Sequence, residues 1–180
     1  MSYLVRKVNK RKNLDYLKCV TDMCDVNADM PTGEFKTTER SLSTWYINSL
    51  TDLDNAVLAI AITSNDITKM DFIVIDTNIL DENELQYNQT YAGMQIAVPD
   101  LQDTHYDIQE ISLKKLENCC AVYKKVLQDD DGKEIYLVRY AAGQIKDLII
   151  DAIKAHRIDS NKAKGKVKDA ILELELRHNQ

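Results

Sequence analysis

The chain has 180 residues, of which 44% are hydrophobic and 29% are charged, and its formal net charge at pH 7 is −6. No apolar run approaches the roughly 20 residues of a membrane-spanning helix, and the basic segment 1–18 lacks the apolar stretch of a secretory signal. We therefore expect a single globular domain over residues 1–180, located in the cytoplasm and without membrane association.

The four cysteines show neither a CxxC pair nor a histidine at zinc-ligand spacing. We expect reduced thiols, no metal site and no cofactor. The chain is poor in Gly and Pro and rich in Asn, Asp, Lys, Ile and Tyr. Such a composition is typical of proteins from AT-rich bacterial or phage genomes.

The first forty residues carry signals for one strand and one helix. Residues Tyr3–Val8 alternate in polarity and predict a strand with one side buried. Apolar residues at helical spacing predict a helix over Leu14–Cys24. The segment Asn27–Gly33 contains Pro31 and is expected to form a loop.

The central part of the chain predicts a strand, a helix and a second strand. Residues Leu42–Ile47 are β-branched and aromatic, and Met70–Asp76 is a short apolar run of the buried-strand type. Between them, Ser49 or Thr51 can cap a helix whose residues Ala56–Ile62 are apolar nearly all round. Such a helix must be covered on more than one side, and the order of elements predicts a βαβ crossover.

The segment Thr77–Asp107 shows little periodicity, although Met94–Val98 has the composition of a short strand ended by Pro99. An irregular segment of this length is uncommon inside a compact domain and is often functional.

The remaining residues predict helices and one further strand. The expected elements are a helix Ser112–Leu127, a turn at Asp131–Gly132, a strand Ile135–Tyr140 and helices Gln144–His156 and Ser160–Arg177. In the last helix lysines precede glutamates, which opposes the helix dipole and would be explained by an acidic neighbour. Residues 144–180 are the candidate for a helical appendage or for homo-oligomerisation. Altogether we predict an α/β or α+β fold, with a small mixed β-sheet and a central βαβ unit covered by helices.

Negative charge is concentrated between Lys69 and Lys114, where the chain has no basic residue. Acidic residues and tyrosines together are typical of a surface that binds a basic protein. The candidate partner-binding residues are Glu82, Glu84, Tyr87, Tyr91, Asp100, Asp103, Tyr106 and Asp107. The alternative is a solvated face that the protein's own basic segments, Arg6–Lys12 and Lys162–Lys168, neutralise. Direct binding of nucleic acid is disfavoured by the negative net charge.

The candidate catalytic residues are Asp76, His105 and Asp107. A histidine flanked by carboxylates can act as a base or a metal ligand near neutral pH. Asp76 ends a buried strand, where α/β enzymes place catalytic acids. The structural alternatives are an exposed or capping His105 and an ordinary loop aspartate. The sequence contains no P-loop, dinucleotide-binding, nucleophile-elbow or HExxH motif.

The sequence favours a non-enzymatic protein-interaction factor, accessory or inhibitory, whose acidic, tyrosine-bearing segment engages a basic partner. Bacterial defence or phage counter-defence is a setting in which such a factor would act. One alternative is a metal-dependent hydrolase or nuclease that uses Asp76, His105 and nearby carboxylates. Another is a small structural subunit of a larger assembly.

Overall fold

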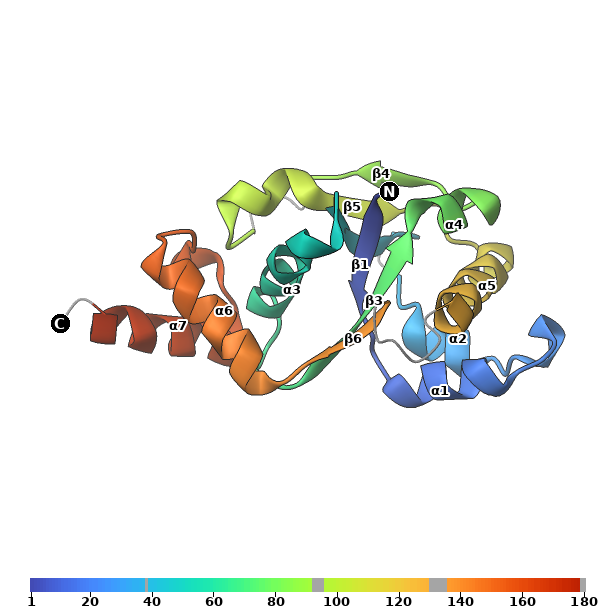
Figure 1. Cartoon of the computed structure of the whole chain (residues 1–180), viewed down its shortest axis with the longest axis horizontal. Helices are drawn as coiled ribbons and strands as arrows, with labels where there is room; N and C mark the ends of the chain where they lie inside the picture. The colour runs from blue at the N-terminus through green and yellow to red at the C-terminus, as the bar shows by residue number, and fades with distance from the viewer. Residues whose placement is uncertain (38, 92–95, 130–135, 179–180) are drawn as a thin grey trace.

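The computed structural model describes residues 1–37, 39–91, 96–129 and 136–178 (Figure 1). The protein is built around a six-stranded sheet with the order β4-β5-β2-β1-β3-β6. The strands are β1 (Tyr3–Lys7), β2 (Leu42–Ile47), β3 (Met70–Asp76), β4 (Tyr87–Gln89), β5 (His105–Ile108) and β6 (Leu137–Tyr140). Every described pair of strands is antiparallel. Helices covering an antiparallel sheet define an α+β fold, which confirms the predicted fold class.

The predicted strand, helix and strand of the central segment are confirmed as β2, α3 (Leu53–Ile62) and β3. Ser49 caps the short 3₁₀ turn that leads into α3, because its hydroxyl accepts the N–H of Thr51. Strands β2 and β3 run parallel but are not neighbours, since β1 lies between them and pairs with both. The mixture of parallel and antiparallel pairs that we expected therefore does not occur among the described strands.

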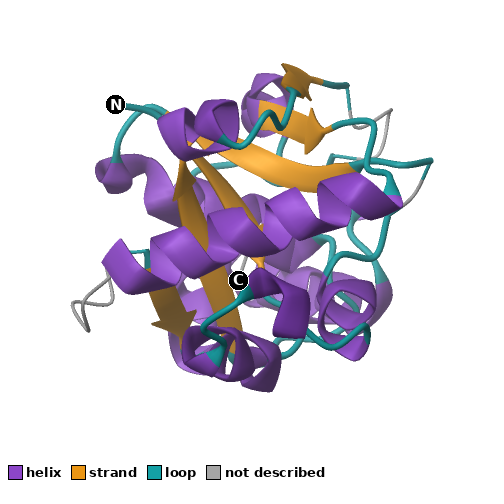
Figure 2. Ribbon diagram, turned by 90° about the vertical axis from the view of Figure 1, so that its right-hand side faces the viewer, coloured by secondary structure: helices purple, strands orange, loops and turns teal. Residues whose placement is uncertain are grey.

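Two groups of helices cover the two faces of the sheet (Figure 1). The first face carries α3, α6 (Ala142–Lys154) and α7 (Gly165–His178), and the second carries α1 (Arg11–Cys19), α2 (Asp29–Glu34), α4 (Thr77–Glu82) and α5 (Leu113–Asp129). In Figure 2 the long helix α5 crosses the strands on the second face. Strand β1 supplies Tyr3 and Val5 to the first core and Leu4 and Val8 to the second, as the alternation of a strand requires.

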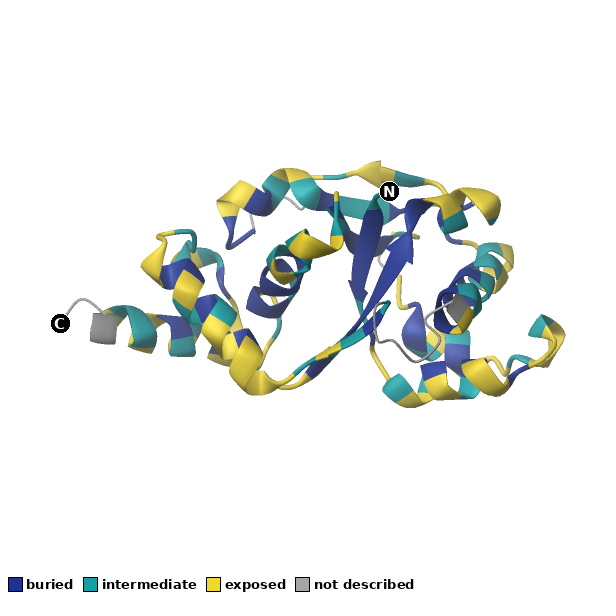
Figure 3. Ribbon diagram, in the orientation of Figure 1, coloured by how far each residue is buried: buried dark blue, intermediate teal, exposed yellow. Residues whose placement is uncertain are grey.

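The first-face core explains why α3 is apolar nearly all round. This helix packs against β1 and β2 on one side and against α6 on the other, as predicted. The central strands are buried, and the helices on both sides of the sheet alternate buried and exposed stretches (Figure 3). Ile145 of α6 and Ile171 of α7 are fully buried, and burial of each such side chain contributes about 1.5–3 kcal/mol. The outer side of α7 exposes Leu172 and Leu176. Within the described residues, no helix is both long and apolar enough to cross a membrane.

Two predictions for the N-terminal third are wrong. The expected loop Asn27–Gly33 largely forms helix α2. Pro31 is tolerated there because it lies in the first turn, where backbone N–H groups have no partner within the helix. The helix expected over Leu14–Cys24 is α1, which ends at Cys19, and Met23–Asp25 forms a separate 3₁₀ turn.

The segment Thr77–Asp107, which lacks sequence periodicity, contains α4, β4, a 3₁₀ segment η4 (Pro99–Thr104) and the start of β5. Of the strand expected at Met94–Val98, the first two residues lie outside the described residues, and Ile96–Val98 is buried but irregular. The turn predicted at Asp131–Gly132 also lies outside the described residues.

An acidic neighbour lies at the start of α7, as the order of its charges led us to expect. Lys166 Nζ is 3.3 Å from Asp66 Oδ2, and its backbone N–H donates to the carbonyl oxygen of Asn65. Gly165 has a φ of +53°, and a Cβ at this position would lie 2.9 Å from Asn65 O. The expected start of this helix is instead a separate 3₁₀ turn, η5 (Ser160–Lys162).

Candidate functional site

The sheet splits between β1 and β2. The two strands are paired as far as Val5 and Trp45. Beyond this point β1 continues along β3, and β2 continues along β5. Arg6 bridges the split, because its Nη1 donates to the carbonyl oxygen of Ser43 at 2.9 Å. The two halves of the sheet therefore diverge and leave room for side chains between them.

A pocket of about 330 Å³ lies over this split, and we call it the split-sheet pocket. Its lining residues are Arg6, Lys7, Asn9, Ser43, Trp45, Ile60, Thr63, Ile96, His105 and Lys164. Three of these residues carry a positive charge and none of them carries a carboxylate. Trp45 and Ile60 add apolar surface. The lining is therefore cationic, although the net charge of the protein is −6.

Lys7 is a half-buried cation with no anionic partner among the described residues. Burial lowers the pKa of Lys7 below its ordinary value of 10.5, because partial desolvation disfavours the charged form. A partly desolvated ammonium group that lines a pocket and lacks a counterion is a candidate for ligand binding.

Arg6, the preceding residue of β1, extends to the second face and has partners there. Besides its bond to Ser43, its Nη2 donates to the carbonyl oxygen of Glu34 at 3.4 Å. The Glu34 side chain is fully buried, and its carboxylate accepts the backbone N–H groups of Asn9 and Lys10 at 3.0 and 3.1 Å. Burial raises the pKa of Glu34, against the opposing effects of these two hydrogen bonds and of the Arg6 charge. Arg6 is thus a structural cation.

His105, on β5, borders the pocket and is held at both ring nitrogens. Nε2 lies 2.5 Å from Ser43 Oγ, and Nδ1 lies 2.9 Å from Thr90 Oγ1 and 3.2 Å from the Thr90 carbonyl oxygen. A carbonyl oxygen only accepts hydrogen bonds, so Nδ1 carries the proton. When the ring is neutral, Nε2 accepts from the Ser43 hydroxyl. The strand register produces this contact, because His105 lies opposite Trp45, two residues from Ser43 on the same face.

Asp107 completes the network around His105. Thr90 Oγ1 donates to Asp107 Oδ2 at 2.9 Å, and Asp107 Oδ1 lies 4.0 Å from His105 Nε2. The side chains of Asp107, Thr90, His105 and Ser43 therefore form one connected polar network.

Of the three candidate catalytic residues, the structure brings two together. His105 and Asp107 share the network, whereas Asp76 caps helix α4 by accepting the N–H of Asn78 at 2.9 Å. Asp76 lies opposite Tyr3 in the sheet and does not line the split-sheet pocket. Across the described part of the chain, no group of three or more His, Cys, Asp or Glu side chains is arranged to hold a metal ion.

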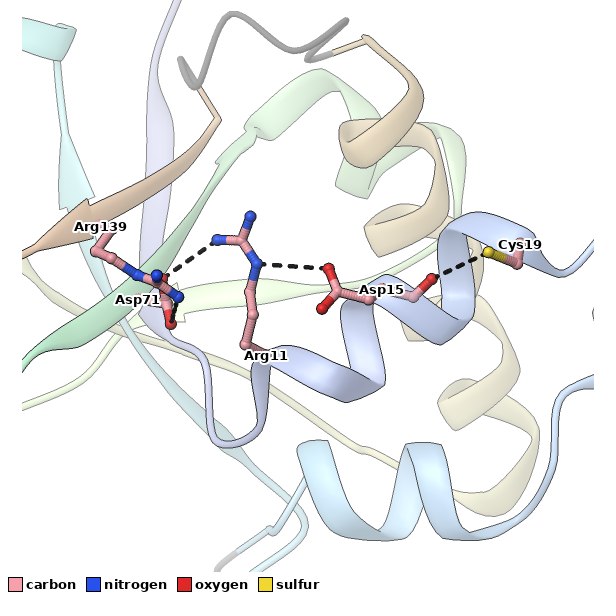
Figure 4. Close-up of polar contacts among 5 residues, drawn as sticks. All are labelled: Arg11, Asp15, Cys19, Asp71 and Arg139. Carbon is pink, nitrogen blue, oxygen red and sulfur yellow. Dashed lines mark hydrogen bonds and ion pairs between the residues drawn. The ribbon is translucent and has the colours of Figure 1, made fainter.

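Part of the acidic interval is neutralised by the protein's own arginines and lysines. Asp71 accepts from Arg139 Nε at 2.8 Å and from Arg11 Nη1 at 3.2 Å (Figure 4). Arg11 also pairs with Asp15 in the next turn of α1 at 3.6 Å. Glu82 with Lys125 and Asp100 with Arg157 are two further ion pairs of this kind.

The candidate partner-binding residues divide between the two faces of the sheet. Glu84 and Tyr87 border one hollow beside β4, and the Tyr87 ring lies 6.4 Å from that of Tyr106, centroid to centroid, over the second-face core. Asp107 points to the first face with His105, and Asp103 follows Leu101 of the first-face core in η4. Two further candidates, Glu82 and Tyr91, are exposed. Glu84 and Asp107 therefore lie on opposite faces of the sheet.

Sequence reasoning missed Lys7, Ser43 and Lys164 as site residues. A signal for Lys7 was present, since it follows Tyr3 and Val5 at two-residue spacing on an otherwise apolar strand face. Ser43 occupies the equivalent place in β2. No local pattern marks Lys164, which reaches the pocket through the docking of the segment before α7.

Comparison of the chain with protein-family models, curated proteins and solved structures gave no match. Function has therefore to be inferred from the pocket and from the residues around it.

Proposed function

We propose that the protein binds a small anionic molecule in the split-sheet pocket. The observation that carries the proposal is the half-buried ammonium group of Lys7, which lines the pocket without an anionic partner among the described residues. Lys164 adds a second positive charge, and the amide side chain of Asn9 also lines the pocket. A bound anion would provide the missing counter-charge.

The energetics of Lys7 favour such a ligand. In the free protein, partial desolvation of the ammonium group has a cost that no carboxylate of the described residues offsets. The lowered pKa of Lys7 is a consequence of that cost. A charge-assisted hydrogen bond to an anion contributes about 1.5–3 kcal/mol, which corresponds to an affinity about 10- to 100-fold higher.

The size of the pocket and the charge of the whole protein restrict the class of anion. Ligand pockets commonly span about 300–1,000 Å³, so a pocket of about 330 Å³ suits a small phosphate or carboxylate compound. The net charge of −6 would repel a long polyanion such as nucleic acid. We therefore favour a metabolite-sized ligand that carries one or two anionic groups.

Isothermal titration calorimetry with inorganic phosphate, pyrophosphate and citrate tests this function. We expect saturable binding of at least one of the three anions, weakened about 10- to 100-fold by Lys7→Met. Lys12→Met is the matched control, because Lys12 is an exposed lysine of α1 outside the pocket. Absence of binding by all three anions, or equal affinity in the wild type and Lys7→Met, would contradict the proposal.

A second candidate function is the binding of a basic protein beside the edge strand β4. An open hollow next to this strand is lined by Asp81, Glu84 and Tyr87, together with Lys115, whose Nζ donates to the carbonyl oxygen of Glu84. Edge strands offer unpaired backbone groups to a partner, and the two carboxylates would attract a basic one. A partner retained on the immobilised protein should be released by salt and by combined Asp81→Asn and Glu84→Gln replacement. A partner that neither salt nor the double replacement releases would exclude this surface as its binding site.

A further inference from the structure

Ser43 and His105 have the geometry of a nucleophile and its base. Ser43 is exposed on β2 and lines the split-sheet pocket, and its Oγ lies 2.5 Å from His105 Nε2. With the ring proton on Nδ1, the serine hydroxyl donates to the free electron pair of Nε2. This is the arrangement in which an imidazole removes the proton of an attacking hydroxyl.

The orientation of the ring is fixed by groups behind it. His105 is buried, its Nδ1 faces both oxygen atoms of Thr90, and Thr90 is in turn bonded to Asp107. The ring of Trp45 packs edge-on against the imidazole, with centroids 5.1 Å apart. A histidine that only stabilises the fold would need no exposed partner, yet the partner of Nε2 is a hydroxyl that faces a pocket. The ring is therefore held firmly on one side and reaches an accessible group on the other.

We propose that Ser43 acts as a nucleophile, with His105 as its general base, in the hydrolysis of small esters that carry an anionic group. The nucleophile is inferred from the Ser43–His105 contact alone, whereas the anionic character of the substrate rests on the proposed function of the pocket. This assignment differs from the metal-dependent hydrolase that the sequence analysis gave as an alternative, because it uses Ser43 as the nucleophile in place of Asp76 and a metal.

The chemistry balances without a further reactant apart from water. Ser43 Oγ bonds to the ester carbonyl carbon while its proton passes to His105 Nε2. The bond between that carbon and the alcohol oxygen then breaks, and the departing oxygen takes the proton from Nε2. A water molecule next gives a proton to Nε2 and its oxygen to the acyl carbon. The bond to Oγ breaks, Ser43 recovers its proton, and a carboxylic acid is released.

The cations of the pocket would act on the substrate in this reaction. Lys7 and Lys164 line the same space as Ser43 and would bind the anionic group of the ester. Their positive charge also favours the negative charge that develops on the carbonyl oxygen. Substrates with an anionic group should therefore be preferred over neutral ones.

Labelling with an uncharged alkyl fluorophosphonate, which reacts with activated serines, tests the nucleophile independently of the anion site. We expect one adduct, located on Ser43 by peptide mass spectrometry, and no adduct in Ser43→Ala. Ser64→Ala is the control, because the Ser64 hydroxyl only bonds back to the carbonyl of Ile60 in α3 and its loss should leave labelling unchanged. An unreactive wild type, or equal labelling of Ser43→Ala, would overturn the assignment.

Replacement of the base gives a second measurement. His105→Gln should slow labelling about 100-fold or more, since a positioned base contributes about 10²- to 10⁴-fold. If this variant has a lowered melting temperature, Ser43→Ala still decides the question, because its side chain is exposed. Labelling of His105→Gln at the wild-type rate would exclude His105 as the base.

Hydrolysis of two chromogenic esters separates this inference from the proposed function. With 4-nitrophenyl hemisuccinate, which carries a carboxylate, Lys7→Met should lower kcat/KM about tenfold or more. With the neutral 4-nitrophenyl acetate the loss should be smaller, because only the stabilisation of the charge on the carbonyl oxygen is affected. If Ser43 is labelled but the anionic ester is not preferred, the nucleophile is supported and the proposed anion site is contradicted. Binding of phosphate by a protein whose Ser43 is not labelled would support the anion site and overturn the nucleophile.

Discussion

Arg6 and Lys7 are adjacent cations on β1, but their side chains lie in different environments on the two faces of the sheet. Arg6 is buried towards the second face, where it donates to two carbonyl oxygens and lies near the Glu34 carboxylate. Lys7 is half-buried towards the first face and has no anionic partner among the described residues. A strand that alternates its side chains can therefore place one charge in the packing and the next in a binding pocket. Replacing each residue in turn tests this distinction.

Glu34→Ala should have the largest effect. It would leave the buried N–H groups of Asn9 and Lys10 without acceptors and remove the negative charge near Arg6. We expect a loss of about 3 kcal/mol in the free energy of unfolding, measured by urea denaturation. Glu117→Ala, at an exposed position of α5, is the control and should change this value by less than about 0.5 kcal/mol. Equal effects of the two substitutions would show that Glu34 does not hold the turn after β1.

Arg6→Met should follow with a loss of about 2 kcal/mol. Methionine keeps much of the buried length but leaves the carbonyl oxygens of Ser43 and Glu34 without their donor, and the bridge across the split disappears. The same denaturation experiment measures the change. Wild-type stability in Arg6→Met would mean that Arg6 is not a structural cation.

Lys7→Met should change the free energy of unfolding by less than about 0.5 kcal/mol, or increase it, because no anionic partner within the described part of the chain is lost and a desolvated charge is removed. The variant should nevertheless bind phosphate or pyrophosphate more weakly. Replacing Lys7 should therefore weaken anion binding without lowering stability. A large loss of stability in this variant would place Lys7 in the same structural class as Arg6.

The dependence of stability on pH should show the smallest effect. The pKa of Lys7 is lowered in the folded protein, so the unfolded state holds more protons between that lowered pKa and 10.5. The contribution of Lys7 to the free energy of unfolding should therefore rise with pH through this window. Anion affinity should fall in the same window, because Lys7 loses its positive charge. Arg6, Lys164 and His105 also line the pocket, but none of them occupies the position of the Lys7 ammonium group. Stability and binding curves for Lys7→Met should lack both changes.

The strands that the sequence predicted are those whose own residues favour a buried strand. β1, β2 and β3 are rich in β-branched and aromatic residues and match the expected ranges closely. β4 and β5 are only three and four residues long, and their polar residues carry no alternation. β5 forms because β2 offers a pairing edge, and β4 forms because β5 then offers the next one, so both depend on the assembled sheet.

The site could be predicted only in part, for a related reason. His105 and Asp107 are neighbours in the sequence and were found together. Ser43 is 62 positions away from His105 and reaches it only through the register of β2 and β5. The sequence also left open how far the acidic interval is neutralised, because a count along the chain does not show that Asp71 and Asp100 pair with arginines from other segments.

The central claim, that Lys7 is a binding cation, is tested most directly by calorimetric titration of pyrophosphate into three proteins. We predict saturable binding to the wild type and to Lys12→Met, with an affinity about tenfold or more lower in Lys7→Met. The same affinity in all three proteins would contradict the claim.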